Sequence, residues 1–95
     1  MKTITYDPLK REKLLKPPRN IDIHTVAHML QSGQFIAKYP HPDPERKNQT
    51  IYIINYNNYP YVVPVVETVT ELCIKTAYQK RELKTIYSDY FTQDD

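Results

Sequence analysis

The spacing of hydrophobic and polar positions changes several times along this chain, and the changes predict its helices and strands. TIYIINY, residues 50–56, alternates as a β-strand does, with Ile51 and Ile53 on one side and Tyr52 on the other. Asn57-Asn58 follows this run. Because asparagine tolerates a positive φ, these two residues predict a tight hairpin turn.

The segments around this hairpin predict further strands. The returning strand, residues 59–70, contains Pro60 and Pro64. Proline has no N–H for a β-ladder, so we expect an edge strand or a bulge near Pro64. ELCIKTAY, residues 71–78, has apolar residues on both sides and favours a central strand. Two further strands are predicted, a short one at residues 2–6 (KTITY) and another at residues 34–39 (QFIAKY). The proline-rich residues 40–49 (PHPDPERKNQ) predict a loop.

Two helices are predicted between the first two strands. Asp7 can accept a hydrogen bond from a free N–H of the first helix, and Pro8 suits its first position. Pro17-Pro18 ends that helix, because the residue before a proline avoids the helical region. The second helix is predicted over residues 22–32, and Gly33 stands where a left-handed cap is favoured.

The last strand is expected to lead into a third helix. Apolar residues recur there at spacings of three and four, at Leu83, Ile86, Tyr87, Tyr90 and Phe91. Residues 1–95 therefore predict one α+β domain with two layers. We expect an antiparallel sheet of four to five strands, with the two N-terminal helices and the C-terminal helix packed on one face.

Composition limits the class of protein. The 95 residues carry a formal net charge of +2, nine tyrosines and one cysteine, Cys73. A lone cysteine excludes an intramolecular disulfide and a cysteine-based metal site, and it indicates a reducing compartment. No run approaches the ~20 apolar residues that cross a bilayer, and no signal peptide is seen, so we expect a cytoplasmic protein without a membrane partner.

Cations gather in two segments. Lys10 to Arg19 holds five cations and one acidic residue. The candidate RNA-binding residues are Lys10, Arg11 and Lys13 in this segment, with Arg46 and Lys47 near the end of the proline-rich loop. The alternative is that these side chains form a solvated helix face and a solubilising loop tip.

His24 and His28 are four residues apart and share a helix face. A metal site would need a third ligand, which the sequence does not suggest, so no metal and no cofactor are expected. The other interpretations are that both histidines are simply exposed on the helix, or that they have an acid–base or RNA-contacting role.

The final strand and helix carry the residue types that a phosphate-handling site needs. These candidates are Lys75, Tyr78, Lys80 and Arg81. A solvated helix start and strand edge is the alternative interpretation.

Two stretches carry a family resemblance. They are Ile4-Thr5-Tyr6-Asp7-Pro8 with Lys10 and Leu14, and Leu72-Cys73-Ile74-Lys75-Thr76-Ala77-Tyr78 with Arg81-Glu82 and Tyr87. The first is similar to the aromatic-Asp-Pro strand end and basic helix that open the BrnT family of toxins. The second is similar to that family's last strand and following helix. The chain departs from the family at residues 16–20, which replace a Lys-His-Gly turn, and at Tyr78, where the family usually has arginine.

The resemblance implies a RelE-like fold and a ribonuclease toxin of a type II toxin–antitoxin system that inhibits translation. RNA, such as mRNA, and a cognate antitoxin protein are then the partners, in a homodimer or a toxin–antitoxin hetero-oligomer. Metal-independent cleavage needs a base, a cation cluster and an acid. The implied catalytic residues are Lys75, Tyr78, Lys80, Arg81 and His24, and His24 or His28 is the natural base if the second helix packs beside the strand end.

Two functions of other classes stay open at this point. The tyrosine-rich sheet suits a catalytically inactive protein-interaction module. The Lys10–Arg19 segment suits a small nucleic-acid-binding domain without catalysis.

Overall fold

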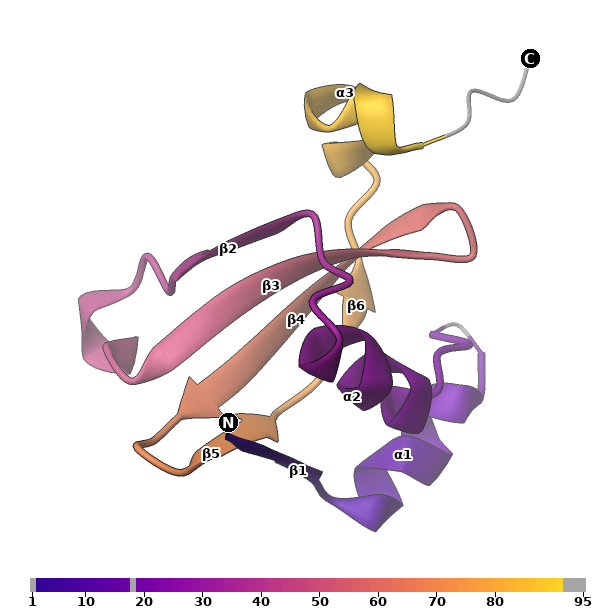
Figure 1. Cartoon of the computed structure of the whole chain (residues 1–95). Coiled ribbons are helices and arrows are strands. Elements are labelled where there is room, and N and C mark those ends of the chain that lie inside the picture. Colours follow the sequence, from indigo (N-terminus) through magenta and orange to yellow (C-terminus); the bar gives the residue numbers. More distant parts are fainter. Residues whose placement is uncertain (1, 18, 92–95) are drawn as a thin grey trace.

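The computed structural model describes residues 2–17 and 19–91, and Figure 1 shows a curved sheet flanked by helices. The N-terminal elements are β1 (Thr3–Tyr6), α1 (Pro8–Leu15) and α2 (Ile23–Gln31). The central elements are β2 (Ala37–Pro40), the short 3₁₀-helix η1 (Pro44–Arg46), β3 (Gln49–Tyr56) and β4 (Tyr59–Glu67). The C-terminal elements are β5 (Glu71–Ile74), β6 (Tyr78–Gln79), α3 (Leu83–Ile86) and the 3₁₀-helix η2 (Ser88–Tyr90).

The strands of the sheet run in the order β1-β5-β4-β3-β2, and β6 also pairs with β4. β2 to β5 form the expected antiparallel meander. β1 pairs with β5 in parallel, so the sheet is mixed and the prediction of a purely antiparallel sheet was wrong. The position of β1 follows from long-range burial of Ile4 and Tyr6 against the core, which local alternation does not specify.

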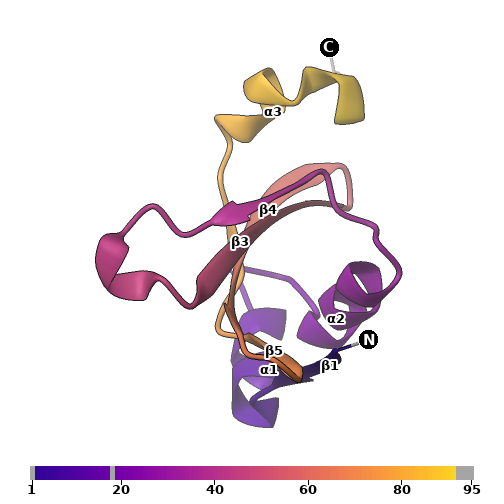
Figure 2. The same cartoon turned by 60° about the vertical axis from the view of Figure 1, so that its left-hand side comes forward.

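Both α1 and α2 pack on one face of the sheet, which we call the helix face (Figure 2). The helices and their connection contribute Leu14, Ile21, Ile23, Val26 and Leu30 to the core, and the sheet contributes Tyr52, Ile54, Tyr61, Val63, Val65, Ile74 and Ala77. This apolar burial provides the main favourable free energy of the fold.

The opposite face of the sheet, here the back face, carries a second and smaller core. Ile51, Ile53 and Val62 pack there with Leu83 of α3. The expectation that all helices share one face was therefore wrong, because α3 lies on the other side of the sheet from α2 (Figure 2).

The predicted C-terminal amphipathic helix is also shorter than its pattern suggested. α3 has four residues, and Tyr87 leaves the helical region at φ −112° and ψ 43° before η2 begins. Ile86 and Tyr90 are 67% and 56% exposed, so the apolar spacing does not correspond to one buried stripe.

The two prolines of β4 do not make it an edge strand; they interrupt the strand that pairs with it. β4 is central: it pairs with β3 on one side and with β5 and β6 on the other. The carbonyls of Pro64 and Pro60 accept hydrogen bonds from the N–H groups of Lys75 and Lys80. Since the N and O of a residue in a strand point to the same side, both missing N–H groups face the side shared by β5 and β6. The last strand therefore divides at residues 75–77.

Local signals for caps and turns are confirmed. The carboxylates of Asp7 and Asp22 accept hydrogen bonds from backbone N–H groups at the starts of α1 and α2. Asn57 and Asn58 have φ of 53° and 60° in the β3–β4 hairpin, and Gly33 has φ 77° after α2. The strand expected at residues 34–39 begins later, at Ala37.

Two alanine variants of α3 test its packing. Leu83 is 7% exposed, so Leu83→Ala should destabilise the protein by about 2–4 kcal/mol through reduced burial and a cavity. Ile86→Ala, in the same turn, should change stability by less than about 0.5 kcal/mol because that side chain is exposed. Urea unfolding of both variants measures the difference, and equal losses of stability would contradict the described packing.

Candidate functional site

The segment from Lys75 to Arg81 follows β5 and leads into α3. Tyr78 pairs with Val62, whose side chain belongs to the back-face core, so Tyr78 lies on the back face. The backbone N–H of Lys75 donates to the carbonyl of Pro64, which is two residues from Val62 on β4. Side chains two residues apart on a strand share a face, so Lys75, opposite Pro64, also lies on the back face. Pro60, opposite Lys80, is four residues from Pro64, so the two lysine backbones are roughly 13 Å apart along the sheet.

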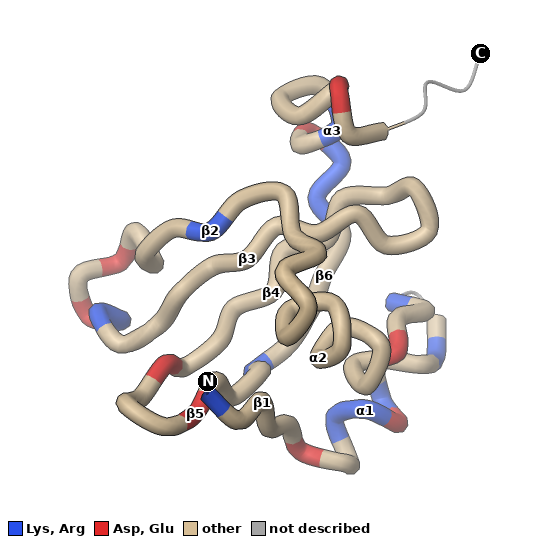
Figure 3. The backbone as a smooth tube through the Cα atoms, viewed as in Figure 1, with Lys and Arg blue, Asp and Glu red and all other residues tan. Residues whose placement is uncertain are grey.

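The polar side chains of this segment are open to solvent. Lys75, Lys80 and Arg81 are exposed, and Tyr78 is 37% exposed. Within residues 2–17 and 19–91, the three cations make no ion pair and no side-chain hydrogen bond. Figure 3 shows the cationic stretch that immediately precedes α3. The structure thus leaves positive charge available along one exposed segment.

Two further tyrosines, Tyr39 of β2 and Tyr87 directly after α3, lie in the electrostatic neighbourhood of one another or of Tyr78. Tyr39 of β2 pairs with Ile51 and shares the back face with Tyr78. Burial raises the pKa of Tyr39, and the neighbouring phenols of Tyr87 and Tyr78 raise it further. Tyr39, Tyr78 and Tyr87 form what we call the tyrosine cluster. Aromatic rings of this kind can stack on unpaired nucleobases.

Tyr39 and Tyr87 are not among the candidates expected from the sequence. The strand alternation around Tyr39 is visible, but its face depends on the β2–β3 register, where Tyr39 pairs with Ile51. The apolar spacing places Tyr87 on a buried helix stripe, whereas it is only half-buried and packs at the margin of the back-face core.

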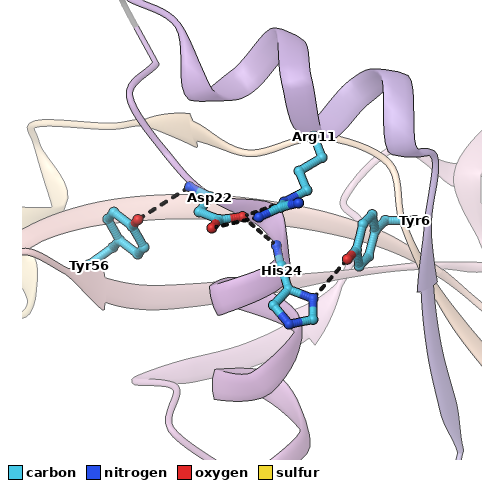
Figure 4. Close-up of polar contacts among 5 residues, drawn as sticks. All are labelled: Tyr6, Arg11, Asp22, His24 and Tyr56. Atoms are coloured by element: carbon cyan, nitrogen blue, oxygen red, sulfur yellow. Dashed lines mark hydrogen bonds and ion pairs between the residues drawn. The ribbon is translucent and has the colours of Figure 1, made fainter.

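His24 lies on the other side of the sheet from Tyr78. Its Nδ1 is 2.8 Å from the hydroxyl of Tyr6 (Figure 4). Its ring lies edge-on to that of His28, with 5.3 Å between the ring centroids. Tyr6 pairs with Ile74 and packs against the helix-face core. The sheet therefore separates His24 from the tyrosine cluster, and the structure does not bring the candidate base to the candidate cations.

Arg11 joins α1 to the start of α2. Its Nε and Nη2 donate to the two carboxylate oxygens of Asp22 at 2.9 and 3.3 Å (Figure 4). The Asp22 backbone N–H also donates to the Tyr56 hydroxyl at 3.2 Å. Hydrogen bonding from Arg11 holds the pKa of Asp22 below its ordinary value. Arg11 thus has a structural partner, unlike its neighbours Lys10 and Lys13 among the described residues.

The other predicted RNA-binding residues occupy two separate places. Lys10 and Lys13 lie on α1 and line a pocket with Arg19 and Thr76. Arg46 is 3.8 Å from the carboxylate of Asp43, and it and Lys47 lie in the η1 loop. Figure 3 shows that this loop is at the opposite end of the sheet from α1, so the five candidates do not form one surface.

Metal and membrane features are both missing from the described residues. No group of three or more His, Cys, Asp and Glu side chains in this part of the chain is arranged to hold a metal ion. None of the described helices has the length and apolar character that crossing a bilayer requires.

No family model, curated protein or solved structure matches this chain. The resemblance to the BrnT family stays a prediction.

The Arg11–Asp22 pair predicts a pH dependence of stability. Folding lowers the pKa of Asp22. The stability that the Asp22 carboxylate adds to the folded protein is therefore complete above the ordinary carboxyl pKa of about 3.9. It is lost as the pH falls through the lower pKa that Asp22 has in the folded protein. Asp22→Asn keeps a capping side chain but removes the charge. We expect the variant to be less stable than the wild type at pH 7 and to lose less stability between pH 4 and pH 2.

Urea unfolding across this pH range measures the effect. Arg11→Gln should flatten the same part of the profile, because it removes the partner that lowers the pKa. Parallel profiles for the wild type and both variants would show that the pair does not couple to folding.

Proposed function

We propose that this protein is the toxin of a type II toxin–antitoxin system, a cytoplasmic, metal-independent endoribonuclease that inhibits translation and is neutralised by an antitoxin protein. The observation that carries the proposal is the exposed segment Lys75–Arg81, whose cations make no ion pair in the described part of the chain. It lies next to the tyrosine cluster on the back face of the sheet.

This surface suits RNA cleavage through attack by a 2′-oxygen. The 2′-oxygen forms a bond to phosphorus, the bond from phosphorus to the 5′-oxygen breaks, and the leaving oxygen takes a proton. Lys75, Lys80 and Arg81 would stabilise the negative charge that develops on the phosphate. Arg81 is suited to two phosphate oxygens at once because its guanidinium is a planar fork. Tyr78 and Tyr39 would hold the flanking bases by stacking.

Proton transfer needs a group on the same face. His24 lies across the sheet, so we assign the base to a residue that adjoins the exposed segment. Glu82 directly follows Arg81, is exposed, and makes no ion pair within residues 2–17 and 19–91. Its carboxylate would accept the 2′-hydroxyl proton, and the carboxylic acid formed in this way would supply the proton that the leaving 5′-oxygen takes, directly or through a water molecule.

The order of elements also supports the proposal. A strand, two helices, an antiparallel meander and a C-terminal helix follow one another along the chain. That order is the one implied by the resemblance to the BrnT family.

A second candidate is RNA binding without cleavage. Lys10 and Lys13 on α1 make no ion pair in the described part of the chain, and they share a pocket with Arg19. This concentration of charge would hold a phosphate backbone even if the back face were inactive.

Removing the back-face cations tests the nuclease. Lys75→Ala with Arg81→Ala should lower RNA cleavage by the purified protein, measured with EDTA present, by at least about 100-fold. The same variant should relieve growth arrest on expression. Arg46→Ala with Lys47→Ala removes the same charge from the η1 loop and should keep activity near the wild-type rate.

Two outcomes would overturn parts of this proposal. If the Lys75→Ala, Arg81→Ala variant still cleaves RNA, these residues do not form the active site. Salt-sensitive RNA binding by the wild type without any cleavage would favour the second candidate. Circular dichroism of each variant shows whether the fold is retained.

A further inference from the structure

We propose that the pocket between α1 and the β5–β6 connection holds a backbone phosphate of the same RNA strand that is cleaved on the back face; this assignment rests on the proposed function. The pocket has a volume of about 280 Å³ and is lined by Lys10, Lys13, Leu14, Pro17, Arg19 and Thr76. Three of these side chains are cations, and none is acidic.

The chain after α1 turns back to form the wall of the pocket. Asn20 adopts φ 49°, a left-handed conformation that asparagine tolerates. The N–H of Asn20 donates to the carbonyl of Lys16 at 3.2 Å, and that of Ile21 donates to the carbonyl of Leu14 at 2.9 Å. Ile21 is fully buried, which anchors the return. The connection is therefore a hydrogen-bonded loop that places Arg19 opposite α1.

Hydrogen bonds fix both the guanidinium and the backbone carbonyl of Arg19. Its Nη1 donates to the carbonyl of Ala77 at 2.6 Å and to Oγ1 of Thr76 at 3.3 Å. The buried Tyr61 donates its hydroxyl to the Arg19 carbonyl at 2.8 Å. Within the described residues, Nη2 and Nε of Arg19 make no hydrogen bond. The guanidinium thus keeps donors for a ligand while its position is fixed.

Charge identifies the class of ligand. Lys10, Lys13 and Arg19 repel one another across the pocket, and an anion placed between them would be stabilised by all three. The Thr76 hydroxyl adds a polar group to the lining. A phosphate group suits this combination, because both ammonium and guanidinium groups bind its oxygens.

The position of Thr76 connects the pocket to the back face. Thr76 bonds to Arg19 on the helix side, while Lys75 and Tyr78 lie on the back face. β5 and β6 both pair with β4, and the side chains of the irregular segment between Ile74 and Tyr78 lie on both sides of the sheet. An RNA strand that rounds the sheet at this break would contact the pocket and the tyrosine cluster in turn. The pocket should therefore contribute to RNA binding and not to the chemical step.

Kinetics and phosphate titration test this assignment together. Lys10→Gln with Lys13→Gln should raise KM for a short RNA about tenfold with little change in kcat. It should also reduce the salt slope of RNA binding by about 0.7 for each phosphate that the variant no longer neutralises. In the wild type, inorganic phosphate should shift the amide NMR signals of Thr76 and Arg19, and these shifts should weaken in the variant. Arg46→Gln with Lys47→Gln removes the same charge from the η1 loop, which lies at the opposite end of the sheet from α1 and outside the proposed RNA path, so this control should keep the wild-type KM.

The outcomes separate this inference from the proposed function. If KM is unchanged in the pocket variant while Lys75→Ala with Arg81→Ala abolishes cleavage, the pocket assignment is wrong and the nuclease stands. If phosphate shifts Thr76 and Arg19 but the wild type never cleaves or binds RNA, the pocket binds anions and the proposed function fails. An equal rise of KM in the control variant would show that net charge, not the pocket, is responsible.

Discussion

The pairing of β4 with two successive short strands is the constraint on which the rest of the structure depends. β4 is central to the sheet and buried over most of its length, yet it contains two prolines that cannot donate to its neighbour. β5 and β6 therefore pair with β4 on either side of a break at residues 75–77. A continuous strand would have kept this segment within a regular ladder. The break instead leaves polar side chains accessible on both sides of the sheet.

The two sides of the sheet carry different chemistry as a result. On the helix side, Arg19 bonds to Thr76 and Ala77, next to the cations of α1. On the back face, Tyr78 lies near Tyr39 of β2, which is also close to Tyr87 after α3, and Lys75 shares this face. The first arrangement suits phosphate binding and the second suits base stacking with charge stabilisation. The Arg11–Asp22 pair positions α1 against α2, so it supports the pocket without belonging to it.

Local chemistry made much of this fold predictable from the sequence. Asp7, Asp22 and Gly33 mark helix ends through their own side-chain or backbone preferences, and the Asn57-Asn58 turn follows from tolerated positive φ. Non-local pairing was not predictable in the same way. Nothing around Ile4 indicates a parallel partner 68 positions away at Leu72, and the face that α3 covers depends on tertiary burial of Leu83. Arg19 was one of five cations in its segment, and only its contacts with Thr76 and Ala77 single it out.

The most direct test of the account is to find which face of the sheet meets RNA. A short single-stranded RNA with 2′-deoxy nucleotides cannot undergo attack by its own 2′-oxygen, so it can be titrated into the intact protein and followed by NMR. We expect the ring signals of Tyr39, Tyr78 and Tyr87 to shift. Shifts confined to Tyr6, His24 and His28, with the tyrosine cluster unchanged, would contradict it.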